Sequence, residues 1–274
     1  MSYTVTATEY IEIGGVPIAT PAWIATDLSE LNDGPDNRGE NLVVPRRPGA
    51  IFRSKVRDAK IANIPIVIFG DRDPDNNTYA DPRQGLIDNI NLLKKALTTP
   101  NTPLSGSRLL TYYRASGNVE ASVQTSPKLD ITPIGPTSAR AIITIQIPSG
   151  TLRSTTNTVF TQTVDDDATF TINVPGAGDI YGITYGIPGA ANSVIITNNT
   201  TGAAMTMPNP VTTGFTASTL TYAAADGATD ISGKIQTTGT PFWVPLTPGN
   251  NELRVQRAGG ASTTMTITFR AVWL

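Results

Sequence analysis

The sequence predicts a mainly β protein, with an α+β first half and an all-β second half. Abundant Thr and Ile, together with 24 Gly and 21 Pro, favour strands and turns. Only Asp81–Leu97 has the spacing of a long helix, whereas apolar residues elsewhere recur mostly at every second position. Charge also divides the chain, because residues 1–153 hold 16 Lys+Arg and 15 Asp+Glu, whereas residues 154–274 hold 4 and 7.

The boundary between the two halves is expected in a polar segment. Pro148–Asn157 is rich in turn-forming residues and has no apolar periodicity. A chain of 274 residues is long enough for two domains that each bury a core. We therefore expect domains at 1–152 and 153–274.

The composition excludes several kinds of chemistry. The chain has no Cys and no His, so it can hold no disulfide, no Ser-His-Asp triad and no His-ligated zinc. A glycosidase built on two carboxylates needs no His, and Asp165–Asp167 is the obvious acidic cluster. That cluster lies between two alternating segments and is better explained as a solvated hairpin turn. We therefore expect a non-enzymatic protein without catalytic residues, metal ligands or cofactors.

The N-terminus and the hydropathy indicate where the protein is made. The first ten residues lack the basic start and apolar run of a secretory signal, and no segment approaches the length of a membrane span. We expect synthesis in a cytoplasm and no contact with a membrane. The net charge of −2 argues against an obligate nucleic-acid binder.

The chain is expected to begin with a hairpin. Tyr3–Ile13 alternates and is followed by Gly14-Gly15, so Val16–Ile18 should be the returning strand. Pro17 and Pro21 restrict this return to an edge or an irregular strand. A further strand is expected within Trp23–Leu31.

Two arginines in a proline-rich segment are the first candidates for a functional surface. Arg46 and Arg47 lie between Pro45 and Pro48, which makes a stiff loop that loses little backbone entropy on binding. Contact with a partner and ion pairing within the domain are equally good explanations at this stage. If they bind a partner, the neighbouring basic residues belong to the same interface between subunits, because charges at alternate positions can set register between copies. The full candidate set is Arg46, Arg47, Arg53, Lys55 and Arg57.

Two segments have nearly continuous apolar runs, Lys60–Gly70 and Arg140–Ile147. This pattern is typical of strands covered on both faces. Between them, Arg108–Arg114 and Val119–Gln124 predict a hairpin. The loop Asp71–Asn77 has acidic residues at alternate positions, as a calcium loop has.

The calcium interpretation fails at two positions. Asn76 stands where the loop needs Gly, and Pro82 stands where it needs a bidentate Glu. A solvated loop leading into the helix is the preferred interpretation. Asp81 can cap this helix, and Gly85 costs it about 1 kcal/mol relative to Ala, so we expect it to depend on a sheet. Its apolar stripe is Leu86, Ile90, Leu93 and Leu97.

The second half predicts a sandwich or jelly roll of short strands separated by turns. The expected strands are Thr158–Val164, Thr169–Val174, Ile180–Tyr185, Ser193–Thr197, Ala203–Met207, Thr219–Tyr222, Ile231–Gln236, Phe242–Leu246, Glu252–Arg257 and Thr263–Trp273.

Aromatic residues leave a carbohydrate-binding module open as the alternative function. Such a module presents aromatic side chains on one exposed sheet face, which Tyr181, Tyr185, Trp243 and Trp273 could provide. We favour core positions for the two tryptophans, because large aromatics dominate small cores. Tyr181 and Tyr185, expected at a strand edge, remain the glycan-contact candidates.

Three short stretches, taken in order, carry a resemblance to a known family. They are PRRPG at Pro45–Gly49, DPR at Asp81–Arg83, and WVPLTPGNN at Trp243–Asn251 followed by RAVWL at Arg270–Leu274. Together they resemble distal tail proteins of long-tailed bacteriophages (siphophages), particularly those of actinobacteriophages. The Trp243–Asn251 stretch is the most specific, because Pro-Gly-Asn makes the turn into a strand of the final hairpin.

The resemblance implies a structural virion protein at the phage tail tip. Residues 1–152 would form a tail-tube-like split barrel or sheet with one helix, whose copies assemble into a hexameric ring at the tail-tip or baseplate hub. Residues 153–274 would form a galectin-like β-sandwich. The implied partners are the tail tube protein, the tape measure protein, and tail-tip, tail fibre or tail-associated lysin proteins. DNA would pass through the lumen without specific binding.

Overall fold

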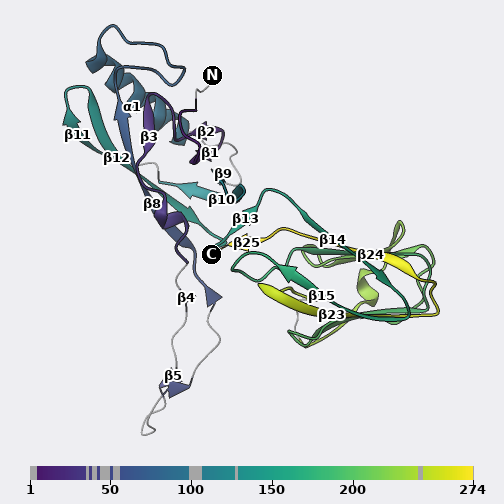
Figure 1. The fold of residues 1–274 in the computed structure, drawn as a ribbon. Coiled ribbons are helices and arrows are strands. Elements are labelled where there is room, and N and C mark those ends of the chain that lie inside the picture. Colours follow the sequence, from purple (N-terminus) through teal and green to yellow (C-terminus); the bar gives the residue numbers. More distant parts are fainter. Residues whose placement is uncertain are drawn as a thin grey trace. The chain divides into compact units, whose positions relative to one another are not determined.

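The computed structural model describes residues 5–34, 37–38, 42–43, 50–51, 56–98, 107–126, 129–239 and 243–273. Between residues 37 and 57 and at Thr98, only the backbone is described. The chain divides into two compact units, Met1–Arg153 with Leu274, and Ser154–Trp273. Figure 1 shows the helices and strands of each unit.

The first unit is built from antiparallel strands and one long helix. A 3₁₀ helix, η1 (Ser29–Leu31), follows its third strand. Its strands are β1 (Tyr10–Ile13), β2 (Val16–Pro17), β3 (Trp23–Ala25), β4 (Asn37–Arg38), β5 (Leu42–Val43), β6 (Ala50–Ile51), β7 (Val56–Arg57), β8 (Lys60–Phe69), β9 (Arg108–Tyr113), β10 (Val119–Thr125), β11 (Asp130–Gly135), β12 (Ser138–Ile147) and β13 (Leu152–Ser154), which spans the division between the units.

The main sheet of this unit has the strand order β2-β1-β9-β10-β12-β8-β3, with β11 added beside β12. The strands β10 and β12 pair through only Gln124↔Gln146 and Thr125↔Ile145, and the sheet curls at this short junction into a half-barrel. Two smaller pairs are β4 with β7 and β5 with β6. The hairpin expected at Gly14-Gly15 is confirmed, since both glycines have positive φ and β2 is an edge strand. The hairpin of β9 and β10 is also confirmed.

The predicted helix is confirmed as α1 (Pro82–Thr98). The Asp81 carboxylate accepts a hydrogen bond from the Arg83 backbone N–H at 2.9 Å, which satisfies a donor that the first turn leaves unpaired. The apolar stripe faces inward as expected, with Leu93 and Leu97 fully buried. Figure 1 shows α1 lying beside β8, against which it packs. No helix in the described ranges has the length and hydropathy to cross a bilayer.

A pair of glycines sets the distance between the helix and the sheet. A Cβ built on Gly85 would lie 2.2 Å from the Gly70 carbonyl oxygen and 2.5 Å from the Tyr79 ring. A Cβ built on Gly70 would lie 2.0 Å from the Pro82 carbonyl oxygen. Gly85, the fourth residue of α1, is unfavourable for helix formation but allows a backbone-to-backbone approach that Ala would prevent.

The expectation that two strands are covered on both faces is wrong for this unit. Both β8 and β12 alternate between buried and accessible residues. The side chains of Ile61 and Ile142 lie on the open face and are 61% and 44% exposed. These two strands thus carry more apolar side chains than the described residues bury. Trp23–Leu31 also differs from its prediction, because the strand stops at Ala25 and η1 follows.

The second unit is a two-sheet sandwich. One sheet has the order β14-β24-β16-β19-β20-β21 and the other the order β15-β23-β17-β18-β22. Tyr185, Phe215 and Phe269 are among the largest side chains in the core between them. A 3₁₀ helix, η2 (Ser232–Lys234), lies between β21 and β22. The strands are β14 (Thr158–Val164), β15 (Asp167–Val174), β16 (Ile183–Pro188), β17 (Ser193–Asn198), β18 (Ala203–Met207), β19 (Gly214–Ser218), β20 (Ala223–Asp226), β21 (Thr229–Asp230), β22 (Gln236–Thr238), β23 (Gly249–Ala258), β24 (Thr263–Phe269) and β25 (Val272–Trp273).

Three of the expected strands are wrong. Thr219–Tyr222 is the turn between β19 and β20, and Tyr222 takes a positive φ of 51° that a strand does not allow. Ile231–Gln236 contains η2. In Phe242–Leu246, Phe242 lies outside the described residues, and the remainder forms only an isolated bridge between Leu246 and Ile180.

The acidic cluster is also placed differently from its prediction. Because β14 and β15 belong to different sheets, Asp165 and Asp166 form a crossover between the sheets rather than a hairpin turn. Of the two tryptophans expected in the core, Trp243 is buried and Trp273 is half-buried. The sandwich itself, with a core of alternating inward residues, agrees with the predicted class.

Candidate functional site

The basic interface candidates fall almost entirely outside the described residues. Arg46, Arg47, Arg53 and Lys55 are not described, and Arg57 is described only as the last backbone position of β7. Their role in a subunit or tube interface therefore stays a prediction. The assignment of residues 1–152 to a tail-tube-like ring domain and of residues 153–274 to a galectin-like domain also stays a prediction.

The two tyrosines proposed to contact a glycan do not share a surface. The Tyr185 side chain is 0% exposed, and its hydroxyl donates to the Val244 carbonyl at 2.7 Å. Burial raises the pKa of Tyr185, so its phenol remains a neutral donor. Tyr181 is 46% exposed. Tyr185 is therefore a core residue, and the glycan-contact prediction is corrected to Tyr181 alone.

In the acidic loop before α1, the Asp73 carboxylate binds backbone groups of the same loop. Asp73 accepts hydrogen bonds from the backbone N–H groups of Asp75 and Asn77 at 3.0 and 2.7 Å. It also accepts one from the Asn77 side chain at 2.8 Å. Within the described ranges, no group of three or more acidic side chains is arranged to hold a metal ion.

Of the three aspartates Asp165–Asp167, Asp167 is held by an arginine of the neighbouring strand β23. Arg254 Nε donates to Asp167 Oδ1 at 2.8 Å, and Arg254 Nη2 bonds the other carboxylate oxygen. This bidentate pair lowers the pKa of Asp167 and raises that of Arg254. An aspartate held ionised in this way is a poor general acid.

The open face of β8 and β12 in the first unit exposes large apolar side chains among polar ones. It carries Ile61, Pro65 and Val67 from β8, paired in register with Gln146, Ile142 and Arg140 of β12. A hollow of about 520 Å³ lies over part of this face. Its lining holds one acidic and one basic residue, Asp130 and Arg140, among apolar and hydroxyl side chains. A neutral, apolar surface of this kind suits protein contact better than catalysis.

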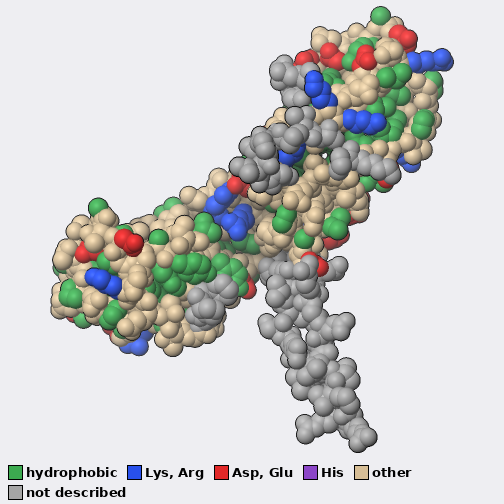
Figure 2. Space-filling model, turned by 180° about the vertical axis from the view of Figure 1, so that it is seen from behind, with side chains coloured by type: hydrophobic (Ala, Val, Ile, Leu, Met, Phe, Trp, Pro, Cys, Tyr) green, Lys and Arg blue, Asp and Glu red, His purple; other side chains and the backbone are tan. Residues whose placement is uncertain are grey.

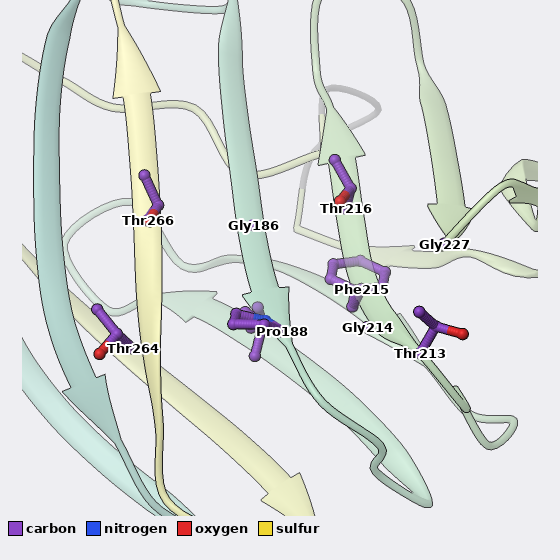
Figure 3. Close-up of a pocket in the computed structure, with 10 residues that line it drawn as sticks. Gly186, Pro188, Thr213, Gly214, Phe215, Thr216, Gly227, Thr264 and Thr266 are labelled. Atoms are coloured by element: carbon purple, nitrogen blue, oxygen red, sulfur yellow. The ribbon is translucent and has the colours of Figure 1, made fainter.

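The second unit has a shallow hollow of about 310 Å³ on the outer face of its six-stranded sheet (Figure 3). Figure 3 shows Thr264 and Thr266 along β24 and Thr216 on β19, on either side of β16. Gly186 of β16 lies in register between Thr266 and Thr216, and the missing side chain leaves the gap. The hollow is lined by Gly186, Ile187, Pro188, Thr213, Gly214, Phe215, Thr216, Gly227, Thr264 and Thr266. With no ionisable side chain, it offers hydroxyl groups but no acid–base chemistry.

Low charge is a property of the whole second unit. Residues 154–274 contain only 4 basic and 7 acidic residues. Figure 2 shows few blue or red side chains on the visible face of this unit. The described surface therefore offers sites for neutral contacts rather than for charged ligands.

Sequence reasoning missed several buried polar residues that form hydrogen bonds inside each unit. Asn89 of α1 is 0% exposed, and its side chain donates to the carbonyls of Phe69 and Arg72 at 2.7 and 2.8 Å. Its position three residues after Leu86, within the apolar stripe, was the available signal. In the sandwich, Asn198 and Asn251 are both 0% exposed and joined by a hydrogen bond of 3.1 Å.

A buried arginine of the sandwich was also missed. Arg257 is 1% exposed, and its guanidinium donates to the carbonyls of Ala261 and Ala190 at 2.6 and 3.2 Å. Its Nε is the one buried side-chain nitrogen or oxygen without a hydrogen-bond partner among the described residues. Arg257 therefore joins two loops at one end of the sandwich and has no described carboxylate partner. It follows Val255 at the inward phase of β23, which is the signal that alternation provides.

Comparison with known proteins identifies the fold. The chain matches no protein-family model and no curated protein sequence. Among solved structures it is similar to the Dit protein of phage SPP1, described as a paradigm of the hub adsorption apparatus in phages that infect Gram-positive bacteria. The two share 12% sequence identity with a TM-score of 0.66, over 98% of this chain and 100% of the Dit chain.

Two chains of the phage P2 baseplate, in its activated conformation with Ca or with Sr, are also similar. They are 8% and 10% identical over 97% and 96% of this chain, and both cover 98% of the baseplate chain. Their TM-scores of 0.38 and 0.39 are too low to establish a shared fold. The likeness to SPP1 Dit spans both units, and the chain therefore has the fold of a phage distal tail protein.

Proposed function

We propose that this chain is a structural, non-enzymatic protein of a bacteriophage virion. In this proposal, it forms a hexameric ring at the distal end of the tail and links the tail tube to the tail-tip or baseplate proteins. The observation that carries the proposal is the likeness to SPP1 Dit over essentially the full length of both chains. A shared fold alone does not carry function, so the surfaces must support it as well.

The open face of β8 and β12 supports assembly. Its Ile61 and Ile142 side chains are 61% and 44% exposed, although the strands have the apolar pattern of segments buried on both sides. Large apolar side chains left exposed on one sheet face are typical of interaction surfaces. A subunit that is covered by its neighbours in a ring accounts for this excess of apolar residues.

The balance of charge supports a role around a channel. The first 153 residues hold 16 basic and 15 acidic residues, so this part of the chain offers no strong positive field to DNA. Binding of phosphates requires a surplus of Lys and Arg. In the proposed ring, DNA passes through the lumen without being held, and the contacts of the chain are with the tail tube, tape measure and tail-tip proteins.

The mass of the purified full chain, measured by light scattering across concentration and salt, tests this proposal. A ring predicts a mass of six chains or a multiple of six, with a population that grows as concentration rises. Chains that never associate in sixes at any concentration would contradict it. Replacing both Arg46 and Arg47 by Glu tests the predicted interface, and we expect this variant to fold but to assemble less.

The carbohydrate-binding alternative has lost most of its support. It depended on aromatic side chains gathered on an exposed sheet face, and Tyr185 is buried. The hollow in Figure 3 is lined by threonines and glycines, and its one aromatic residue, Phe215, is 1% exposed. If the full chain does not bind glycans, the structural role is the one proposal that remains.

A further inference from the structure

The sandwich of the second unit closes differently on its two sides. On one side the sheets end in β21 and β22, which are 2 and 3 residues long. On the other side they end in β14 and β15, which are 7 and 8 residues long and succeed each other along the chain. We call this second side the β14/β15 edge, made of Thr158–Val164 and Asp167–Val174. Neither strand has a further strand beside it among the described residues.

The β14/β15 edge lacks the devices that natural proteins use against strand pairing. Such devices are short strands, Pro, bulges and outward charges, especially Lys. The strand β14, TVFTQTV, contains no Pro and no charge, and it pairs with β24 without a register shift. The strand β15 has one charged residue, Asp167 at its beginning, which Arg254 already neutralises. Two long strands of high β-propensity therefore present free backbone groups side by side.

The core is also incomplete along this side. Phe160 of β14 and Phe170 of β15 stack on each other across the two sheets, with ring centroids 5.6 Å apart. Both rings pack against the core but are only partly buried, whereas Phe215 and Phe269 deeper in the sandwich are 1% and 2% exposed. Burying the rest of these rings would be favourable at about 25 cal/mol per Å² of apolar surface.

We propose that the β14/β15 edge binds the same edge of a second copy of this chain, by antiparallel pairing of β14 with β14 and of β15 with β15. The sequence of each strand fits a two-fold axis. An axis at Thr161 sets Val159 opposite Thr163 and Phe160 opposite Gln162 of the other copy. No like charges meet in this arrangement of β14.

A two-fold axis close to the one at Thr161 suits β15 as well, because the Phe170 ring stacks on Phe160, the neighbour of Thr161. Pairing about Phe170 sets Thr169 opposite Thr171, and Asp167 opposite Asn173, so no carboxylates face each other. The contact is then isologous, as in most two-fold dimers. The four phenylalanines of the two copies close the open side of both cores. This contact lies wholly within the second unit and does not depend on the ring.

A charge on the edge strand tests the proposal. We expect Thr161→Lys in the full chain to halve the mass measured by light scattering, because an edge lysine opposes strand pairing. The control is Thr237→Lys on β22, which places the same charge on an exposed position of the opposite, short edge and should leave the mass unchanged. Circular dichroism and the thermal midpoint establish that both variants remain folded.

Disulfide trapping gives an independent measurement, since the native chain contains no cysteine. In the proposed contact, position 161 faces its own copy at the 4.5–5.5 Å between α-carbons of an antiparallel pair, roughly the range that a disulfide spans. Thr161→Cys should therefore yield a covalent dimer with an added oxidant, and Thr237→Cys should not. An unchanged mass for Thr161→Lys, or equal cross-linking at both positions, would overturn the proposal.

The ring and the edge contact fail in different ways. If the ring is absent and the edge contact is present, the native chain is a dimer that Thr161→Lys converts to a monomer. If the edge contact is absent, the native chain and Thr161→Lys have the same mass, whether six chains or one. Loss of tail assembly in Thr161→Lys at unchanged mass would assign the edge to a different polypeptide and reject pairing between copies.

Discussion

The two units of the molecule handle apolar surface in opposite ways. In the first unit, a curled sheet is covered by α1 and leaves a whole strand face open, with Ile61 and Ile142 exposed. In the second unit, two sheets cover each other, and apolar side chains are left incompletely covered mainly at an edge and in turns. The first unit also carries 31 of the 42 charged residues, counted over residues 1–153. The first unit thus leaves large apolar side chains exposed on a sheet face, whereas the second leaves them mainly at one edge and in turns.

Each unit also has its own buried asparagine side chain or pair that binds backbone groups. In the first unit, Asn89 fastens the helix to the loop after β8 through two carbonyls. In the second unit, Asn198 and Asn251 bind each other and the loop before β23, and both are fully buried. Each network satisfies backbone groups that the strands leave unpaired, so each is costly to break.

The close approach of α1 to the sheet should not tolerate one added methyl group. We expect Gly85→Ala to destabilise the first unit by about 3 kcal/mol, because its Cβ would overlap the Gly70 carbonyl at 2.2 Å. Helix propensity alone predicts the opposite sign, a gain of about 1 kcal/mol. Urea unfolding of the full chain measures the change. Gly233→Ala in the second unit, where the added Cβ meets nothing within 4 Å, is the control, and a gain in stability from Gly85→Ala would refute the packing argument.

The asparagine network of the sandwich should come next. We expect Asn251→Ala to cost the second unit about 2 kcal/mol, because it leaves the Thr247 N–H without its acceptor and removes one of the two acceptors of the Asn198 amide. Asn250→Ala is the matched control. The Asn250 side chain is exposed and bonds only Asn173, so its loss should cost less than about 0.5 kcal/mol. Equal losses from both variants, measured by denaturant midpoints, would rule out the buried network as the cause.

A pH effect should appear in the second unit. The Asp226 carboxylate accepts hydrogen bonds from the backbone N–H groups of Thr212, Thr213 and Gly214, which hold the pKa of Asp226 well below its usual range. A carboxyl with a lowered folded-state pKa stabilises the fold above the ordinary Asp pKa of about 3.9, and this stabilisation is lost as pH falls below that value. The pKa of Asp167 is also lowered, by Arg254, which acts in the same direction.

The thermal midpoint of the second unit should therefore fall between pH 5 and pH 2.5, values chosen to bracket an Asp pKa of about 3.9. Asp226→Asn should lower the midpoint at pH 7 and make its decline in acid shallower, leaving the part due to Asp167. A variant that keeps the full acid-dependent decline would show that the turn around Asp226 does not contribute to it.

The smallest effect is expected on the open face of the first unit. Ile142→Thr replaces an apolar side chain that is 44% exposed, and we expect it to change the free energy of unfolding by less than about 0.5 kcal/mol. Ile143→Thr, at the next position of β12 and 1% exposed, should cost several times more. If this face binds a neighbour, Ile142→Thr weakens assembly while Ile143→Thr weakens folding. Equal effects of the two on unfolding would contradict the alternation of β12.

Much of the secondary structure could be predicted from the sequence, because local signals were consistent. The bounds of α1 differ from the predicted helix by one residue at each end, and β14 and β18 agree with their predictions at both ends. The Asp81 cap predicted the start of the helix, and period-two alternation predicted the two strands. The Thr219–Tyr222 error arose because a turn can alternate as a strand does, whereas the true strand β20 is mostly alanine and has a weak signal.

The surfaces could be predicted less well, because burial depends on contacts distant in sequence. Continuous apolar runs predicted two covered faces on β8 and β12, but in the part of the chain that the structure describes only one face of each strand is buried. Tyr185 shares the inward phase of β16 with Ile183 and Ile187, so alternation along that strand, correctly bounded, places it in the core. Arg257 required knowledge of the two loops whose carbonyls it binds.

Electron microscopy of the purified full chain tests the central claim most directly. The account predicts ring-shaped particles whose class averages have six-fold symmetry, seen both with the native chain and with Thr161→Lys. Six-fold averages in both samples would establish the ring independently of the edge contact. Particles without rotational symmetry, at concentrations where light scattering shows no further association, would contradict the proposed role at the end of a phage tail.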